Sequence, residues 1–296
     1  MTDVVLCVMS QKGLAVIQSV VEILGSSISL VVIGQDKSVL NDFSLEISQV
    51  CEKYNLKKIF RSNFNGKFSP QAMVICAGWR WLVNHPNENL VIFHDSLLPK
   101  FRGFAPLVNM LISGETKIGV TAILGATNYD EGDIISQSST RIDYPIKIND
   151  AIQINNENYS KLAQCIALKL VHGSKFDANP QANKQSTYSI WRDELDYFID
   201  WSLSSFVIKR TVDALGFPYD GAKIKTKQGE LVNVHDVEIV DDINVFPRHV
   251  GKVIFLNSGM PTIICGKGMI KITNATYENQ MELGDFLPLK SLRTRF

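Results

Sequence analysis

The sequence predicts an α/β fold: an N-terminal domain with a Rossmann-like, mostly parallel sheet, followed by a small β-rich domain with an OB-like barrel. Over roughly the first 190 residues, apolar strand-like runs alternate with helical stretches, as in the βαβ crossovers of doubly wound sheets. Beyond them, one helix precedes five short apolar runs separated by Gly, Asn and Pro, which is typical of a small barrel. We therefore expect domains at residues 1–190 and 191–296.

Short apolar runs predict the strands of the N-terminal domain. Between the first two, residues 14–24 place apolar side chains at helical spacing, and a second helical stretch ends near Tyr54. Asp150 is expected to cap a long helix that reaches Val171 and ends before Gly173. The expected strands are Val4–Met9, Ile28–Gly34, Lys57–Phe60, Ala72–Cys76, Leu90–Phe93, Gly119–Leu124 and Asp133–Ile142.

The C-terminal domain begins after a polar linker. A helix at Phe206–Leu215 is expected to end at Gly216, because Gly and the nearby Pro218 both favour a helix stop. The five strands expected after this helix are Lys223–Thr226, Leu231–Val240, Lys252–Leu256, Thr262–Cys265 and Met269–Thr273.

Composition excludes several classes of protein. No apolar run approaches the roughly 20 residues that span a bilayer, and the apolar start lacks a basic leader, so we expect no membrane partner and a cytoplasmic location. Thirty basic against thirty acidic residues argue against nucleic acid as the main partner, because phosphate contacts need concentrated Lys and Arg. The five scattered cysteines show no metal spacing and are expected to be reduced thiols, so no metal is predicted.

The sharpest candidate for chemistry is a histidine at the end of an apolar strand. His94 follows Leu90–Phe93, and an acidic turn containing Asp130 comes 36 residues later, after the next strand. In open α/β sheets, ligands bind outside the carboxyl ends of the strands. If neighbouring strands deliver both side chains to that edge, His94 and Asp130 form a pair that can handle a proton.

The same stretch carries a resemblance to a known family. Its pattern of His, Ser-Leu-Leu-Pro and a later acidic turn resembles the folate-dependent formyltransferases, which act on glycinamide ribonucleotide, on methionyl-tRNA or on nucleotide-linked amino sugars. Two later segments resemble the junction and barrel domain of the tRNA and sugar enzymes, so the resemblance covers nearly the whole chain. The segments that carry it are residues 94–103, 119–121, 130–133, 199–202 and 216–222.

The resemblance implies transfer of a formyl group from 10-formyltetrahydrofolate, a co-substrate, to a primary amine. His94 would accept and return protons around the amine, or donate to the oxyanion when it is protonated. Asp130 would orient the imidazole and favour its charged form, because a nearby carboxylate stabilises a cation. A plain turn residue is the alternative interpretation of Asp130.

Other residues near the strand ends are candidates for ligand contacts. A flat pterin could lie beside Trp79 and Arg80, and an aromatic core corner is the alternative interpretation. The segment after the first strand suits anion binding, and a plain N-cap by Ser10 is the alternative. We assign Trp79, Arg80, Ser96, Leu97, Leu98 and Asn128 to folate, and Lys12, Lys100 and Arg102 to the substrate, with a solvated basic edge as the alternative for the last two.

One position departs from the family pattern. The family has Asn-x-His, but Ile92 stands two residues before His94, on the same face of the strand. The family amide is implied to stabilise the oxyanion, and loss of one such donor typically costs about 10²–10³ in rate. Another group could supply the hydrogen bond, with Asn128 and Asn109 as candidates, or His94 acts alone.

The resemblance leaves the acceptor open. Residues 200–296 carry 12 basic and 11 acidic side chains, a net charge of +1 that is poor for tRNA binding. We therefore expect the amino group of a nucleotide-linked deoxysugar, as in bacterial surface-polysaccharide or nonulosonate pathways, and leave room for a homodimer. The alternatives are methionyl-tRNA formylation, hydrolysis of the formyl-folate, and a binding homologue without turnover, which Ile92 makes conceivable.

Overall fold

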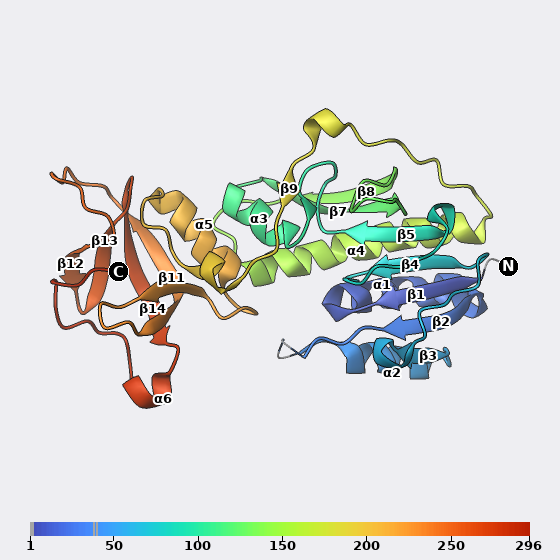
Figure 1. Ribbon diagram of the computed structural model, residues 1–296, viewed down its shortest axis with the longest axis horizontal. Helices are drawn as coiled ribbons and strands as arrows, with labels where there is room; N and C mark the ends of the chain where they lie inside the picture. Colours follow the sequence, from blue (N-terminus) through green and yellow to red (C-terminus); the bar gives the residue numbers. More distant parts are fainter. Residues whose placement is uncertain (1–2, 38, 40) are drawn as a thin grey trace. The chain divides into compact units, whose positions relative to one another are not determined.

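The computed structural model describes residues 3–37, 39 and 41–296 (Figure 1). The chain divides into two compact units. The first holds the residues up to 106 together with 117–141 and 153–189, and the second holds 107–116, 142–152 and 190–296. The division near residue 190 lies where the linker was expected, but two earlier segments are grouped with the second unit. The domain limits at residue 190 stay a prediction.

The first unit contains a seven-stranded sheet in the order β3-β2-β1-β4-β5-β7-β8 (Figure 1). Strands β1 to β5 pair in parallel, whereas β7 pairs antiparallel with both β5 and β8. The predicted mostly parallel, Rossmann-like sheet is therefore confirmed. Its strands are β1 (Val4–Val8), β2 (Ile28–Ile33), β3 (Lys58–Phe60), β4 (Met73–Ala77), β5 (Leu90–His94), β7 (Lys117–Leu124) and β8 (Ile134–Arg141).

Helices α1 (Ser10–Leu24) and α4 (Ile148–Val171) share one apolar cluster with the sheet, and α2 (Ser44–Lys53) adds to it. Side chains alternate between the two faces of a strand, so Leu6 of β1 joins this cluster while Cys7 faces a second cluster on the other side. Helix α1 forms because its apolar residues recur at three- and four-residue steps, and the buried ones among them are Val16, Ile17, Val20, Val21 and Leu24. The sheet is thus covered on both faces, as parallel sheets require.

One local prediction was wrong, and two short features were not predicted. Asp150 lies inside the first turn of α4, which begins at Ile148, so it is not the N-cap; its acidic side chain still suits the positive end of the helix dipole. Helix α3 (Pro106–Ser113) was not predicted. A short ladder, β6 (Arg102–Gly103) with β9 (Tyr188–Ser189), was also not predicted.

The second unit contains α5 (Ser205–Leu215), the four-residue helix α6 (Gln280–Leu283) and a five-stranded antiparallel sheet in the order β10-β11-β14-β13-β12. Ser204 caps α5 by accepting the N–H of Val207, and Gly216 follows its last residue as predicted. The predicted β-rich domain is confirmed, with strands β10 (Ala222–Lys225), β11 (Leu231–Val240), β12 (Val253–Asn257), β13 (Met260–Ile264) and β14 (Met269–Tyr277).

Within the part of the chain that the structure describes, no helix combines the length and the apolar character that crossing a membrane requires. The five cysteines form no disulfide in the structure, and four of them are buried.

Candidate active site

The structure brings His94 and Asp130 together. His94 is the last residue of β5, and its Nδ1 lies 3.3 Å from Oδ1 of Asp130. Both side chains are largely buried. The pair expected from the spacing of the sequence therefore exists, and both side chains belong to the first unit. Their catalytic roles stay a prediction.

The route by which Asp130 reaches His94 differs from the expected one. Because β7 runs antiparallel to β5, Thr121 pairs with His94 while Leu124, the last residue of β7, pairs with Val91. The carboxyl end of β7 thus lies level with the beginning of β5, and not beside His94. The loop that follows must run back along the sheet to place Asp130 at the histidine.

Both ring nitrogens of His94 are engaged. Nε2 lies 2.8 Å from the carbonyl oxygen of Phe101, and a carbonyl can only accept, so Nε2 carries a hydrogen. Nδ1 faces a carboxylate, which favours a second hydrogen there. Burial lowers the pKa of His94, but the hydrogen bond and charge of Asp130, the Phe101 carbonyl and the charge of Asp95 outweigh it and raise the pKa above its usual value. The surroundings of His94 therefore favour its charged, imidazolium form.

Asp130 is held as a carboxylate. Burial raises the pKa of Asp130, but the hydrogen bond and charge of His94, the N–H of Gly103 and the charge of Arg102 together lower it. The Gly103 N–H donates to Oδ2 at 2.7 Å, so each carboxylate oxygen has its own partner. The charged pair is thus fixed at both ends.

The backbone around the pair is strained. Phe101, whose carbonyl meets His94, has a φ of +58°, and Asp130 has a φ of +55°. Residues with side chains rarely adopt this left-handed conformation, and such residues cluster at functional sites. Neighbouring contacts hold it: the Phe101 N–H donates to Oγ1 of Thr187, and Gln181 donates to the carbonyl oxygen of Asp130, both at 2.9 Å or less.

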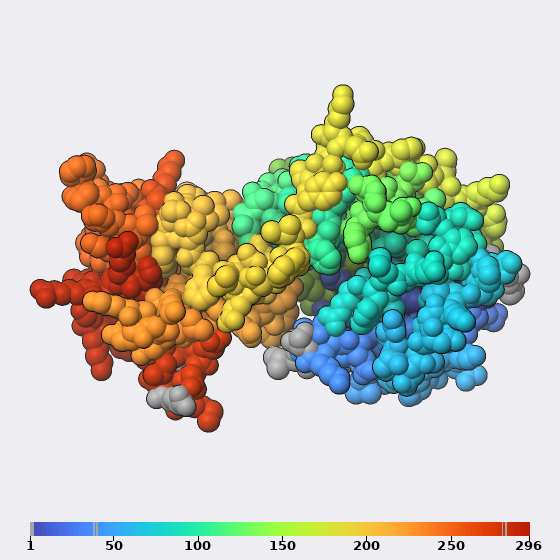
Figure 2. All heavy atoms as spheres, viewed as in Figure 1, coloured from blue at the N-terminus to red at the C-terminus, as the bar shows by residue number. Residues whose placement is uncertain are grey.

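Arg102 fastens these loops to one another. Its side chain is 1% exposed, and its guanidinium donates to Oε1 of Gln181 and Oδ1 of Asn183 and pairs with Glu131 at 3.2 Å. The segment that supplies Gln181 and Asn183 follows α4, is mostly exposed, and lies on the surface of the molecule (yellow in Figure 2). Arg102 was predicted to bind the substrate. In the structure its donors are directed at protein groups, and the substrate role stays untested.

The residues assigned to folate on the loop after β5 are held by neighbouring strands. Ser96 donates to the carbonyl oxygen of Lys100 at 2.6 Å, and the Leu98 N–H donates to Oγ1 of Thr121 at 3.0 Å. Gly119 gives Leu97 room, because a Cβ there would lie 2.7 Å from the Leu97 side chain and closer still to the Ser138 carbonyl. Ser96 and Leu98 are buried, Leu97 is half-buried and Lys100 is exposed.

The aromatic corner after β4 has one unused donor. Trp79 packs against the second apolar cluster with its ring 4.9 Å from that of Trp81, and its Nε1 is buried with no hydrogen-bond partner among the described residues. Arg80 pairs with Asp36 at 2.7 Å. An unpaired buried N–H is costly unless a ligand or water satisfies it, so the corner fits a flat, acceptor-rich ligand.

Ile92 contributes packing. It is half-buried in the second apolar cluster, together with Trp79. Of the two amides considered as substitutes for the missing donor, Asn128 donates to Oε2 of Glu131 at 2.9 Å, and Asn109 belongs to the second unit and accepts from Arg192 at 2.6 Å. Both amides considered as substitutes therefore already have a hydrogen-bond partner within the protein.

We expect Ile92→Ala to be tolerated better than His94→Asn, because Ile92 supplies contact area and no hydrogen bond. The free energy of unfolding should fall by about 1–2 kcal/mol, less than for a fully buried isoleucine, while the turnover of the folded enzyme changes little. Urea unfolding and a formylation assay of both variants test this. Equal losses of turnover would show that residue 92 acts in the chemistry.

The charged pair also predicts how stability depends on pH. Because the folded pKa of His94 is raised above 6.5, its contribution to stability is complete below that pH and is lost as the pH rises through the folded pKa. Urea unfolding of the wild type should show this decline on the alkaline side. In Asp130→Asn the decline should shrink, because the carboxylate that raises the pKa is gone; an unchanged decline would mean that another group titrates there.

Asp95 was missed by sequence reasoning. Its carboxylate is buried and forms an ion pair with Nζ of Lys12 on α1, a residue that we had assigned to the substrate. The only sequence signal was an acidic residue between His94 and Ser96, which on its own predicts nothing about a partner so far away in the chain. Lys12 therefore has a protein partner, and its contact with substrate stays a prediction.

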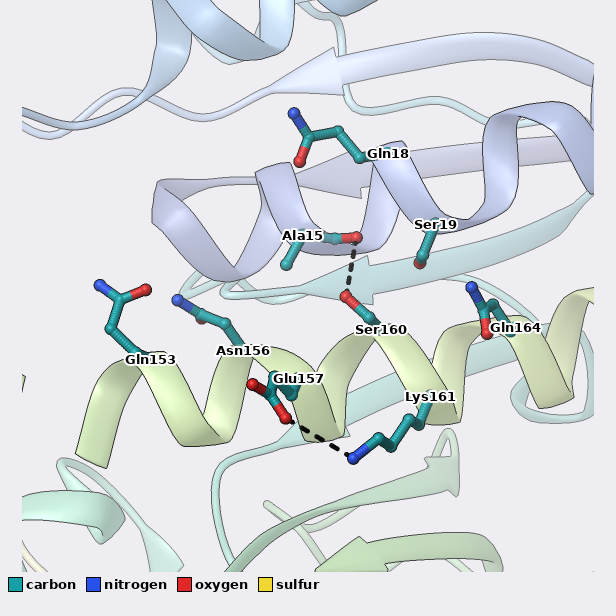
Figure 3. A pocket seen from close by; sticks show the side chains of 9 residues that line it. All are labelled: Ala15, Gln18, Ser19, Gln153, Asn156, Glu157, Ser160, Lys161 and Gln164. Atoms are coloured by element: carbon teal, nitrogen blue, oxygen red, sulfur yellow. Dashed lines mark hydrogen bonds and ion pairs between the residues drawn. The ribbon is translucent and has the colours of Figure 1, made fainter. Parts of the chain in front are cut away.

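A hollow of about 610 Å³ lies elsewhere on the first unit, between α1 and α4. Figure 3 shows Gln153, Asn156 and Ser160 of α4 opposite Ala15 and Ser19 of α1, with a hydrogen bond from Ser160 to the Ala15 carbonyl oxygen. Neither His94 nor Asp130 lines it. We therefore place the candidate active site at the end of β5. Among the described residues, no group of three or more His, Cys, Asp or Glu side chains is arranged to hold a metal ion.

Comparison with known proteins identifies the family. A family model described as formyl transferase matches residues 48–158, which include His94 and Asp130, and the model of the formyl transferase C-terminal domain matches residues 193–288. The chain belongs to the formyl transferase family. As a member, it is a formyl-transferring enzyme, and the recognition made from the sequence motif is confirmed.

Relatives of this formyl transferase fall into two groups. A methionyl-tRNA formyltransferase of Syntrophus aciditrophicus is 29% identical over 237 residues, covering 77% of this chain and 73% of that protein. A Helicobacter canadensis N-formyltransferase, solved with folinic acid and dTDP-3-aminofucose, has a TM-score of 0.72 at 16% identity over 93% of this chain and all of that one. WlaRD, a sugar 3N-formyl transferase solved with dTDP and 5-N-formyl-THF, has a TM-score of 0.69 at 18% identity over 94% and 98%. These structures share the fold.

Proposed function

We propose that the protein is an N-formyltransferase that moves a formyl group from 10-formyltetrahydrofolate to the amino group of a nucleotide-linked amino deoxysugar. The observation that carries the proposal is the ring of His94, held between Asp130 and the Phe101 carbonyl at the carboxyl end of β5. A positive group at this edge of an α/β sheet stands where ligands of such sheets bind.

The folate would supply the formyl group. The corner of Trp79 and Trp81 fits its pterin, because an aromatic face and an unpaired buried N–H suit a flat ring with acceptor atoms. His94 would place its positive charge where negative charge develops as the amine adds to the formyl carbon. Asp130 would keep the ring oriented and charged. A proton on the ring would then be available to the oxyanion that forms.

Two features favour an amino sugar as the acceptor. The solved structures with the same fold include an N-formyltransferase in complex with dTDP-3-aminofucose and a sugar 3N-formyl transferase. Residues 200–296 carry a net charge of only +1, which offers little attraction to the phosphates of a tRNA. Methionyl-tRNA formylation is the second candidate, since the Syntrophus aciditrophicus relative is a methionyl-tRNA formyltransferase.

We place the reaction in the cytoplasm, where the five free cysteines would stay reduced, as one step of a surface-polysaccharide pathway. A homodimer also stays a prediction.

Mass spectrometry distinguishes the candidates. The purified protein is incubated with 10-formyltetrahydrofolate and, in separate reactions, with nucleotide-linked 3-amino and 4-amino deoxysugars or with methionyl-tRNA. A sugar that gains one formyl mass, and does not do so with His94→Asn, supports the proposal. Formylated methionyl-tRNA alone, or free formate alone, would contradict it in favour of the tRNA enzyme or a hydrolase.

A further inference from the structure

The hollow between α1 and α4 is lined by polar side chains whose charges cancel. All nine lining residues belong to the first unit. Four of them are amides and two carry hydroxyl groups, while the ninth that has no polar side chain is Ala15. The two charged ones, Glu157 and Lys161, pair with each other at 3.6 Å. The hollow therefore offers many hydrogen-bonding groups and no unpaired charge from its lining.

Asn156 is the most buried of the lining residues. It is 9% exposed, whereas the other eight are half-buried or exposed. Figure 3 shows its side chain directed from α4 toward α1, into the space between the two helices. Both Oδ1 and Nδ2 lack a hydrogen-bond partner among the described residues. Native structures rarely leave a buried amide unsatisfied, because the loss costs free energy, so Asn156 indicates that a partner from outside the chain belongs here.

The size of the hollow favours a small molecule over a single ordered water. One water takes up about 30 Å³ and would satisfy an amide in a small polar cavity. The hollow measures about 610 Å³ and lies within the range of small-molecule sites, about 300–1,000 Å³. Such sites are usually lined by apolar and aromatic side chains, which this hollow lacks. Its occupant should therefore be polar over most of its surface.

The hydrogen bonds already made around the hollow narrow the chemistry. Ser19 donates to the carbonyl oxygen of Val16 at 2.8 Å, and Ser160 donates to that of Ala15 at 3.4 Å. Their hydroxyl oxygens can still accept, whereas the amide of Asn156 needs both a donor and an acceptor. A ligand hydroxyl supplies both functions at once. An ionic ligand would find no counter-charge, because Glu157 and Lys161 neutralise each other.

We propose that this hollow binds a neutral, hydroxyl-bearing ring of the monosaccharide type, with Asn156 as its central contact. The side chain of Ala15 is only a methyl group, which leaves room for a ring between the helices (Figure 3). At one end, Gln153 of α4 is hydrogen-bonded to Gln11 of α1 at 3.2 Å. The assignment depends on the hollow alone and not on the reaction at His94.

The test is a titration of the full chain followed by ¹H–¹⁵N NMR. The side-chain amide signals of Asn156 are assigned from their absence in Asn156→Leu. The probes are D-glucose and N-acetyl-D-glucosamine, and the comparison compounds are inorganic phosphate and cyclohexanol. We expect a saturable shift of the Asn156 signals with at least one of the two sugars. No shift with either sugar overturns the proposal, and so does an equal response to phosphate or cyclohexanol.

Two variants check that the hollow is the place of binding. Asn156→Leu keeps the size of the side chain and removes both polar atoms, so the affinity for the sugar should fall about tenfold, the loss of one or two net hydrogen bonds. Ala15→Leu fills the hollow without touching the amide and should weaken binding at least as much. Asn65→Leu, which replaces an exposed asparagine outside the hollow, is the matched control and should bind like the wild type.

Stability and the active-site variant complete the test. Asn156→Leu should raise the urea midpoint of the free protein, because an apolar group replaces an unsatisfied buried amide; this shows that the variant is folded. His94→Asn should bind the sugar with wild-type affinity, since His94 does not line the hollow. Loss of binding in His94→Asn would place the sugar at the active site and overturn the proposal, as would wild-type affinity in folded Asn156→Leu or Ala15→Leu. Absence of formyl transfer in the wild type would contradict the proposed function and leave this site standing.

Discussion

Replacing His94 by Asn is expected to lower kcat by about 10²–10⁴, the usual contribution of a positioned proton donor or acceptor. Asn can still donate a hydrogen bond, but it cannot carry the positive charge that Asp130 and the Phe101 carbonyl stabilise on the ring. Asp130→Asn should have a loss of similar kind, because the ring would lose the carboxylate that keeps it charged. Steady-state rates of formylation, measured on folded protein, check both variants.

His85→Asn provides a matched control for that experiment. His85 also contacts a backbone carbonyl through Nε2, that of Ala72, at 2.7 Å, but it packs against Phe68, and no described carboxylate forms an ion pair with it. Its replacement should leave kcat near that of the wild type. Near wild-type rates in His94→Asn or Asp130→Asn would show that the pair does not carry the chemistry.

Replacing Arg102 by Met is expected to lower the free energy of unfolding by about 3 kcal/mol. The substitution keeps an apolar stem of similar length but removes the buried donors that Gln181, Asn183 and Glu131 accept from, and leaves those oxygens without their partner. Urea unfolding measures the loss. Turnover should fall as well, because the loop carrying Asp130 would lose part of its support.

An exposed arginine serves as the comparison for Arg102. Arg141, at the end of β8, is exposed, and Arg141→Met should change the free energy of unfolding by less than about 0.5 kcal/mol. A variant Arg102→Met with wild-type stability and no turnover would instead make Arg102 a substrate contact, as the sequence had suggested.

The sequence predicted the positions of the strands well, because apolar runs record burial. Strands β1, β2, β5 and β11 match their predicted ranges to within a residue or two. The orientation of a strand relative to its neighbours is harder to predict, because parallel and antiparallel strands can contain the same apolar run. The reversed β7 was therefore not foreseen, and with it the backward course of the loop that carries Asp130.

Contacts in the candidate site could be predicted only where both residues belong to the same sequence motif. The spacing of His94 and Asp130 belongs to one recognisable pattern, and the structure brings them together. The contact of Arg102 with Gln181 joins residues 79 positions apart, and that of Lys12 with Asp95 spans 83. Neither Gln181 nor Asp95 lies in a motif or a periodic pattern that points to its partner. A single sequence therefore cannot predict these two contacts.

The residues after α4 that stabilise the loop of Asp130 are synthesised after the rest of the site. A chain emerging from the ribosome exposes β5 and both members of the charged pair well before Gln181, Asn183 and Thr187 are synthesised. Domains fold as units during synthesis, from the N-terminus onward. The site therefore cannot reach its final geometry on a nascent chain that stops at α4, and the enzyme becomes competent only once the segment through residue 189 has been added.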